Sequence, residues 1–206
     1  MIARFGGNTA LLIIDVQIGV DVLAYWGGPF GRRNNPAAEE NIASLLRDWR
    51  REGRQVIFTC HDSREAASPL KLELDTGRFK PGLEPEPREL VIRKDVNSAF
   101  VGTPLEIELR RRGVRRLVCV GFFTNMCVES SVRMANNLGF DTYVVHDACA
   151  TTNRIARDGT DLTPESVHEH SVANMHREFA TAISTADAVR LLRSSASDLA
   201  RQQGNE

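Results

Sequence analysis

The sequence predicts an α/β fold, a single-domain doubly wound (Rossmann-like) sandwich with a six-stranded parallel sheet and helices on both faces. Short apolar runs alternate with amphipathic segments from one end of the chain to the other, which is typical of consecutive β-α-β units. The chain has no internal repeat and no linker-like stretch, and its 206 residues suffice for one core that buries roughly 70% of the unfolded surface. We therefore expect one domain over residues 1–206, with a polar tail at 194–206 that frays.

Six apolar runs are the expected strands. They are Thr9–Asp15, Gln55–Cys60, Leu90–Arg93, Arg115–Gly121, Phe140–His146 and Ala180–Ser184. The first run is continuously apolar up to its final carboxylate, which indicates a central strand covered on both faces.

The expected helices lie between these strands. They run from Pro36 to Gly53, and over Leu105–Arg112, Cys127–Leu138, Thr163–Arg177 and Thr185–Arg193. Proline near the first turn and glycine just past the end delimit several of them. Three stretches, Trp26–Asn35, Arg64–Glu89 and Thr152–Leu162, lack periodicity, and the longest is typical of a lid or a binding segment.

Composition excludes several classes of protein. The net charge is 26 − 27 = −1, and the basic residues form no extended patch, so we expect no nucleic-acid partner. The four cysteines form no CxxC pair, which argues against a disulfide framework or a zinc site and for a reducing compartment. Because no apolar run approaches ~20 residues, we expect no membrane partner and a cytoplasmic location.

Reactive side chains stand at the carboxyl ends of the expected strands, where doubly wound sheets bind their ligands. They are Asp15, His61, Lys94, Cys127 and Asp147. These side chains are therefore the ones that could meet in an active site.

Cys127 is the candidate nucleophile, because it stands where a strand and turn lead into an expected helix. A helix N-terminus favours thiolate over thiol, and its free N–H groups can hold an oxyanion. The alternative is a buried, inert cysteine, since free cysteine is among the most buried residue types.

Asp15 and Lys94 would complement that cysteine. An ammonium lowers the pKa of a neighbouring thiol, and a carboxylate can take the thiol proton and return it to a leaving amine. Taken singly, Asp15 could instead cap a turn and Lys94 could be a solvated lysine. An aspartate after four aliphatic residues is harder to explain structurally, because an apolar residue would otherwise be preferred there.

Three sequence blocks together resemble the isochorismatase-like cysteine hydrolases, in the metal-free amidohydrolase form. The blocks are Leu12–Gln17, Arg93–Phe100 followed by Thr103 and Leu105, and Gly121–Ser130, with His146-Asp147-Ala148 in support. The resemblance extends from about Asn8 to Arg193.

The resemblance implies hydrolysis of a small-molecule amide or related C–N bond through a thioester. Asp15 would be the general base and acid, Lys94 the stabiliser of the thiolate, and Cys127 the nucleophile. A cis peptide bond is implied at Phe122–Phe123, with the backbone N–H groups of Phe123 and Cys127 forming the oxyanion hole. A homo-oligomer, a dimer or a tetramer, is also implied. The alternatives are hydrolysis of an ester or vinyl ether on the same fold, and a non-catalytic small-molecule-binding member.

Metal-dependent members of the family carry an Asp-x-His pair after the second strand. Here that position reads His61-Asp62-Ser63, and Arg64–Glu89 contains no histidine. One histidine offers too few ligands for a zinc site. We therefore expect no metal and no other cofactor.

Substrate-binding candidates are the polar and aromatic residues near these blocks. They are Gln17, Trp26, His61, Ser63, Asn97, Phe100 and Thr124, and the aromatic side chain of Phe122 also falls near the site. For each class a structural role is the alternative: core packing for phenylalanine, turn capping for asparagine, and tethering of the long loop for His61 and Ser63. The remaining histidines, His146, His168, His170 and His176, are expected to be structural.

Overall fold

The computed structural model describes residues 2–193, and a parallel sheet of six strands forms its centre. The strands are β1 (Thr9–Ile14), β2 (Gln55–His61), β3 (Leu90–Lys94), β4 (Arg116–Phe122), β5 (Asp141–Ala150) and β8 (Thr181–Ile183). Their order is β3-β2-β1-β4-β5-β8, and every neighbouring pair is parallel. This is the order of a doubly wound sheet, so the predicted fold class is confirmed. The tail expected at 194–206 lies outside the described residues.

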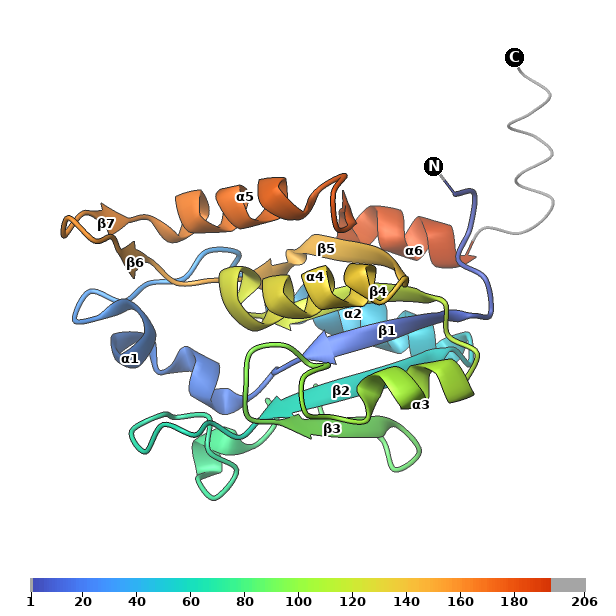
Figure 1. The fold of residues 1–206 in the computed structure, drawn as a ribbon, viewed down its shortest axis with the longest axis horizontal. Helices are drawn as coiled ribbons and strands as arrows, with labels where there is room; N and C mark the ends of the chain where they lie inside the picture. The colour runs from blue at the N-terminus through green and yellow to red at the C-terminus, as the bar shows by residue number, and fades with distance from the viewer. Residues whose placement is uncertain (1, 194–206) are drawn as a thin grey trace, which may run out of the picture.

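Helices cover both faces of the sheet (Figure 1). Helices α2 (Ala38–Arg51) and α6 (Thr185–Arg193) pack on one face, and α3 (Leu105–Arg111), α4 (Glu129–Asn137) and α5 (Pro164–Met175) pack on the other. Strand β1 shows the division clearly, because Leu11 and Ile13 enter one core whereas Leu12 and Ile14 enter the other. Side chains alternate along a strand, so a run of aliphatic residues serves both cores. No helix within residues 2–193 has the length and apolar character needed to cross a membrane.

Strand β5 continues beyond its predicted end at His146, as far as Ala150. Its register with β4 shifts, so that a two-residue step from Cys119 to Gly121 lies opposite a five-residue step from Val144 to Cys149. A polar pair, His146-Asp147, falls in this irregular segment, which is why the apolar pattern breaks before the strand does.

Asp147 therefore does not join the other strand-end residues. Its Oδ1 accepts hydrogen bonds from the backbone N–H and the hydroxyl of Thr185, both at 2.8 Å. Thr185 is the first residue of α6, so the carboxylate serves the N-terminus of that helix, where negative charge is favoured. The expectation that Asp147 could reach the active site is wrong.

Short elements that the sequence did not predict gather at the carboxyl end of the sheet, to which the strand arrows point in Figure 1. They are a 3₁₀ turn at Ile18–Asp21, helix α1 (Leu23–Gly27), a 3₁₀ turn at Asp75–Gly77, and an antiparallel pair of strands, β6 (Arg154–Ile155) and β7 (Asp161–Leu162). Each is too short to leave a periodic signal. They lie in the segments that connect the predicted strands and helices, and they gather around the strand ends.

Gly121 permits β4 to approach β1 beside these strand ends. Its φ is +128°, and a Cβ atom there would lie 2.0 Å from the carbonyl oxygen of Ile14. Glycine is needed on both counts, because other residues are strained at such a φ and a methyl group would overlap the backbone. Ile14 directly precedes Asp15, and Gly121 directly precedes Phe122.

We expect Gly121→Ala to lower the free energy of unfolding by about 3 kcal/mol or more, since it combines backbone strain with a steric overlap. Gly53→Ala is the matched control: it also has a positive φ, +60°, but no atom within 4 Å of the added Cβ. That substitution should cost only about 1 kcal/mol. Urea unfolding of both variants measures the difference, and equal losses would contradict the account.

Candidate active site

Three strand ends bring Asp15, Lys94 and Cys127 together. Asp15 directly follows β1, Lys94 is the last residue of β3, and Cys127 lies in a π-helical turn, Thr124–Val128, that follows β4. The Lys94 ammonium lies 2.6 Å from Oδ2 of Asp15. All three residues are buried. The sequence-based expectation that they could meet therefore agrees with their placement.

Asp15 has a left-handed backbone, with φ of +51°. Aspartate tolerates this conformation better than most residues, but it still costs energy and is kept only where surrounding contacts enforce it. Thr59 of β2 supplies them: its hydroxyl donates to Oδ1 of Asp15 at 2.6 Å, and its carbonyl accepts from the Asp15 N–H at 3.3 Å. Oδ2 is buried and has no aligned hydrogen bond, so one acceptor position of the carboxylate is available.

Asp15 and Lys94 hold each other in the charged state. Burial by itself would raise the pKa of Asp15, but the charge of the Lys94 ammonium acts in the opposite direction, and the pKa lies below its usual value. Burial would likewise lower the pKa of Lys94, but the negative charge of Asp15 reverses this and raises it. A buried carboxylate and a buried ammonium are thus present at neutral pH.

Cys127 differs from the sequence-based expectation in two ways. The helical segment begins at Thr124 rather than near Cys127, and the regular helix α4 begins at Glu129. Burial raises the pKa of the Cys127 thiol, the Asp15 carboxylate raises it further, and the Lys94 ammonium offsets them only in part. The expected low thiol pKa is therefore wrong: a sulfur that is deeply buried beside a carboxylate keeps its proton until a base removes it.

His61 lies at the centre of this cluster. Its Nδ1 is 2.9 Å from the Lys94 ammonium, 3.6 Å from the Cys127 sulfur and 3.7 Å from Oδ2 of Asp15. The sequence suggested His61 as a substrate-binding candidate, with loop tethering as the alternative. The structure places it against all three of the other reactive side chains.

Gln17 holds His61 in place rather than facing a ligand. Its side-chain oxygen accepts from the His61 N–H at 2.7 Å, and its amide nitrogen donates to the carbonyls of His61 at 3.0 Å and Gly77 at 2.7 Å. Both amide hydrogens are thereby used, and Gln17 is fully buried. Gln17, predicted as a substrate-binding candidate, does not line the cavity, and these contacts give it a positioning role.

Asp15, His61 and Cys127 offer atoms that all lie within 4.8 Å of one another and could in principle hold a metal ion. The Lys94 ammonium, however, already contacts two of these three groups. A divalent cation would have to stand beside a buried positive charge, which is strongly unfavourable. The protein's own cation balances this cluster.

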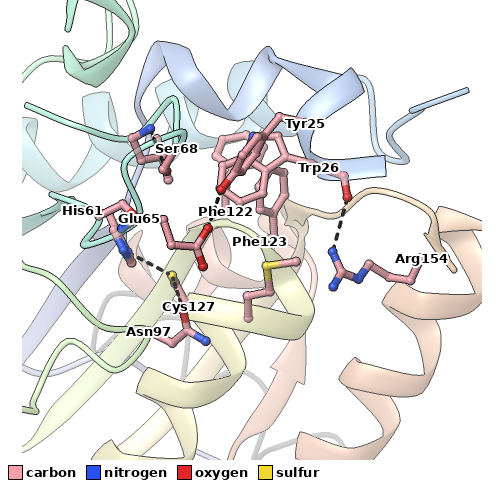
Figure 2. A pocket seen from close by; sticks show the side chains of 13 residues that line it. Tyr25, Trp26, His61, Glu65, Ser68, Asn97, Phe122, Phe123, Cys127 and Arg154 are labelled. Atoms are coloured by element: carbon pink, nitrogen blue, oxygen red, sulfur yellow. Dashed lines mark hydrogen bonds between the residues drawn. The ribbon is translucent and has the colours of Figure 1, made fainter. Parts of the chain in front are cut away.

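A cavity of about 360 Å³ opens above the Cys127 sulfur (Figure 2). Predicted residues that line it are Trp26, His61, Ser63, Asn97, Phe122, Phe123 and Cys127. Sequence reasoning missed Tyr25, Glu65, Ser68, Leu70, Met126 and Arg154. Most of these belong to aperiodic stretches, where the only signal was the aromatic pair at positions 25 and 26 within a glycine-rich segment.

Two further candidates do not line the cavity. Phe100 packs against Phe140 at a ring distance of 6.0 Å within the core beneath α3 and α4, which is the core-packing alternative. The hydroxyl of Thr124 lies 2.9 Å from Nδ1 of buried His168. This contact anchors the π-helical turn to α5, so Thr124 and His168 have structural roles.

Aromatic rings form one wall of the cavity. Trp26 packs edge-on against Phe123 at 5.0 Å, and its indole N–H donates to the carbonyl of Gly19 at 2.8 Å. The hydroxyl of Tyr25 donates to Glu65 at 2.6 Å, which links α1 to the loop after β2 across the cavity. The peptide bond that joins Phe122 to Phe123 is cis.

Comparison with known proteins identifies the family of this chain. Residues 9–187 match the family described as "Isochorismatase domain". The chain belongs to the isochorismatase family. The isochorismatase family protein YrdC of Bacillus subtilis is 38% identical over 176 residues, 85% of this chain and 91% of that protein. An isochorismatase-family crystal structure from Chromobacterium violaceum has a TM-score of 0.85 and 40% identity, covering 91% of this chain and 95% of its own.

A third relative carries a named activity. Ureidoacrylate amidohydrolase RutB of Methylobacterium radiotolerans is 37% identical over 97 residues, which cover 47% of this chain and 34% of that protein. The match is thus confined to part of each protein.

The buried ion pair of this family member should show strong energetic coupling. We expect Asp15→Asn and Lys94→Met each to lower the free energy of unfolding by about 3–5 kcal/mol, since each leaves a buried charge without its partner. The double substitution should cost clearly less than the sum. Urea unfolding measures the cycle, with Arg64→Ala at the exposed Arg64–Asp95 pair as a control without measurable loss. Additive losses at positions 15 and 94 would contradict the coupling.

The same two substitutions should shift the alkylation of Cys127 in opposite directions. Because the Asp15 carboxylate raises the thiol pKa and the Lys94 ammonium lowers it, Asp15→Asn should move the pH profile of iodoacetamide labelling to lower pH, and Lys94→Met to higher pH. We expect each shift to be at least about one pH unit. Mass spectrometry of the folded variants locates the label, with fully buried Cys119 and Cys149 as internal references. Shifts of the same sign would contradict these charge assignments.

Proposed function

We propose that this protein is a cysteine hydrolase that cleaves a C–N bond of a small amide through a thioester on Cys127. One observation supports this most directly: Cys127 lines the cavity, whereas the Asp15 carboxylate and the Lys94 ammonium lie buried behind it. The nucleophile thus faces a small-molecule pocket, and a base and a stabilising cation lie behind it.

Acylation begins with transfer of the thiol proton from Cys127 to the Asp15 carboxylate. The thiolate attacks the amide carbonyl carbon, and the carbonyl oxygen gains negative charge. The resemblance implies that the backbone N–H groups of Phe123 and Cys127 stabilise this oxyanion. Asp15 then returns the proton to the nitrogen, the C–N bond breaks, and the amine leaves behind a thioester.

Deacylation uses the same groups in the reverse order. Asp15 takes a proton from water, and the resulting nucleophile attacks the thioester carbonyl. The C–S bond breaks, the carboxylic acid leaves, and the proton held by Asp15 returns to the sulfur. The enzyme regains its resting state with one amide bond and one water molecule consumed.

Lys94 makes this proton transfer possible. Its charge keeps Asp15 ionised in a buried site, so a base is present at neutral pH. The same charge stabilises the thiolate once it forms. Because Lys94 already supplies a positive charge to the cluster, the proposed reaction uses no metal ion.

The name of one relative supports C–N cleavage over other bonds. RutB is an amidohydrolase, and the proposed thioester chemistry suits an amide carbonyl. An ester on the same pocket would release an alcohol, and a vinyl ether would release a carbonyl compound. Product analysis therefore separates these alternatives.

The direct test is Cys127→Ser, assayed against a panel of small primary amides, ureides, esters and vinyl ethers. We expect ammonia release by the wild type and a loss of kcat of at least about a thousandfold in the variant, because an alcohol is a far weaker nucleophile here. Cys60→Ser, at a cysteine outside the cavity lining, is the control that should retain activity. Full activity of Cys127→Ser would exclude the thioester, and release of alcohol alone would exclude amide specificity.

A further inference from the structure

We propose that Lys94 fixes His61 as its Nε2–H tautomer, and that this N–H is a hydrogen-bond donor in the cavity for an oxygen atom of the substrate. The tautomer follows from the contacts of the resting protein alone. The role toward substrate rests on the proposed function. This donor role implies that the substrate is a small amide with a second oxygen acceptor, such as a carboxylate or a further carbonyl.

The contacts of Lys94 determine the tautomer. Its ammonium lies 2.6 Å from Asp15 Oδ2, 2.9 Å from His61 Nδ1 and 3.1 Å from the carbonyl oxygen of Val96. An ammonium carries three hydrogens and no lone pair, so it can only donate. Nδ1 must therefore present its lone pair, and the neutral imidazole carries its hydrogen on Nε2.

The thiol does not change this assignment. The Cys127 sulfur is 3.6 Å from the same Nδ1, farther than the ammonium, and its hydrogen has another acceptor in Oδ1 of Asn97 at 3.7 Å. Since Lys94 takes the one lone pair of the ring in the shorter contact, His61 is not available as the base for Cys127. This leaves the Asp15 carboxylate for that role.

The opposite side of the ring faces the cavity. Gln17 clamps the backbone N–H and carbonyl of His61, and Nδ1 points to the buried cluster, yet the side chain still lines the cavity. Nε2 has no hydrogen-bond acceptor anywhere in residues 2–193. Its hydrogen is thus held in a fixed direction with no protein partner.

Ser63 supplies a second donor to the cavity lining. The Ser63 hydroxyl oxygen accepts from the backbone N–H of Glu65 at 3.2 Å, and within the described chain its own hydrogen has no acceptor. Ser63 and His61 both line the cavity. Two unused donors in the cavity lining are complementary to an oxygen-rich group, whereas an aliphatic group would leave the donors without partners.

The tautomer can be measured without any substrate. Long-range ¹H–¹⁵N NMR of the histidine rings distinguishes the two tautomers, and the absence of one ring in His61→Asn identifies the His61 signals among the five histidines. We expect the Nε2–H pattern in the wild type and a loss of that preference in Lys94→Met. An Nδ1–H pattern in the wild type would overturn the proposal.

Two conservative variants separate the donor from a structural role. His61→Asn keeps an acceptor near the Nδ1 position for Lys94 but removes the donor, whereas His61→Gln places an amide N–H near the Nε2 position. Succinamate and butyramide are matched probes, because a carboxylate in the first replaces a methyl group in the second. We expect the wild type to prefer succinamate in KM, or in Kd by NMR titration, by about tenfold or more.

His61→Asn should lose that preference, and His61→Gln should retain most of it. A purely structural role for His61 predicts the reverse order, because only asparagine preserves the Lys94 contact, and that result would overturn the proposal. Equal affinity of the wild type for the two probes would also overturn it. If the probes bind with the expected order but no amide is hydrolysed, the proposed function fails and the donor role stands.

Discussion

The ion pair between Lys94 and Asp15 is the interaction on which the rest of the site depends. It connects the ends of β3 and β1 across the intervening strand β2, and β2 contributes Thr59 and His61 to the same cluster. Withdrawing two charges from water is costly unless their remaining hydrogen-bonding groups are satisfied. Here Thr59, His61 and Val96 supply further hydrogen-bonding partners, and the Asp15 carboxylate stays within 4.8 Å of the Cys127 sulfur.

Much of this arrangement could be predicted from the sequence. Asp15 and Lys94 each end an apolar strand, and parallel strands deliver their carboxyl ends to one edge of the sheet. Strand β1 could be assigned because two cores need an unbroken aliphatic run. The position of a reactive residue at a strand end can be recognised locally in the sequence, and it predicts which residues lie together in the fold. This was enough to predict the cluster of Asp15, His61, Lys94 and Cys127.

Other features of the site could not be predicted, because they depend on tertiary contacts that leave no local sequence pattern. Asp147 also ends an apolar run, but the register shift between β4 and β5 carries it to α6. Gln17 lies two residues after Asp15, but the sequence cannot show whether its side chain binds a ligand or, as observed, two backbone carbonyls. The protonation preference of Cys127 likewise follows from burial beside a carboxylate, which helix position alone does not reveal. Glu65 and Arg154 reach the cavity from aperiodic segments.

The clamp formed by Gln17 has an evolutionary consequence. It grips only main-chain atoms, those of His61 and Gly77, and main-chain atoms are present whatever side chains the loop carries. Side chains of the loop after β2, Glu65 and Ser68 among them, can therefore be substituted while Gln17 keeps its hydrogen bonds to the backbone of His61 and Gly77. Side chains that contact the substrate can thus change during evolution without a change in the position of Asp15, Lys94 and Cys127.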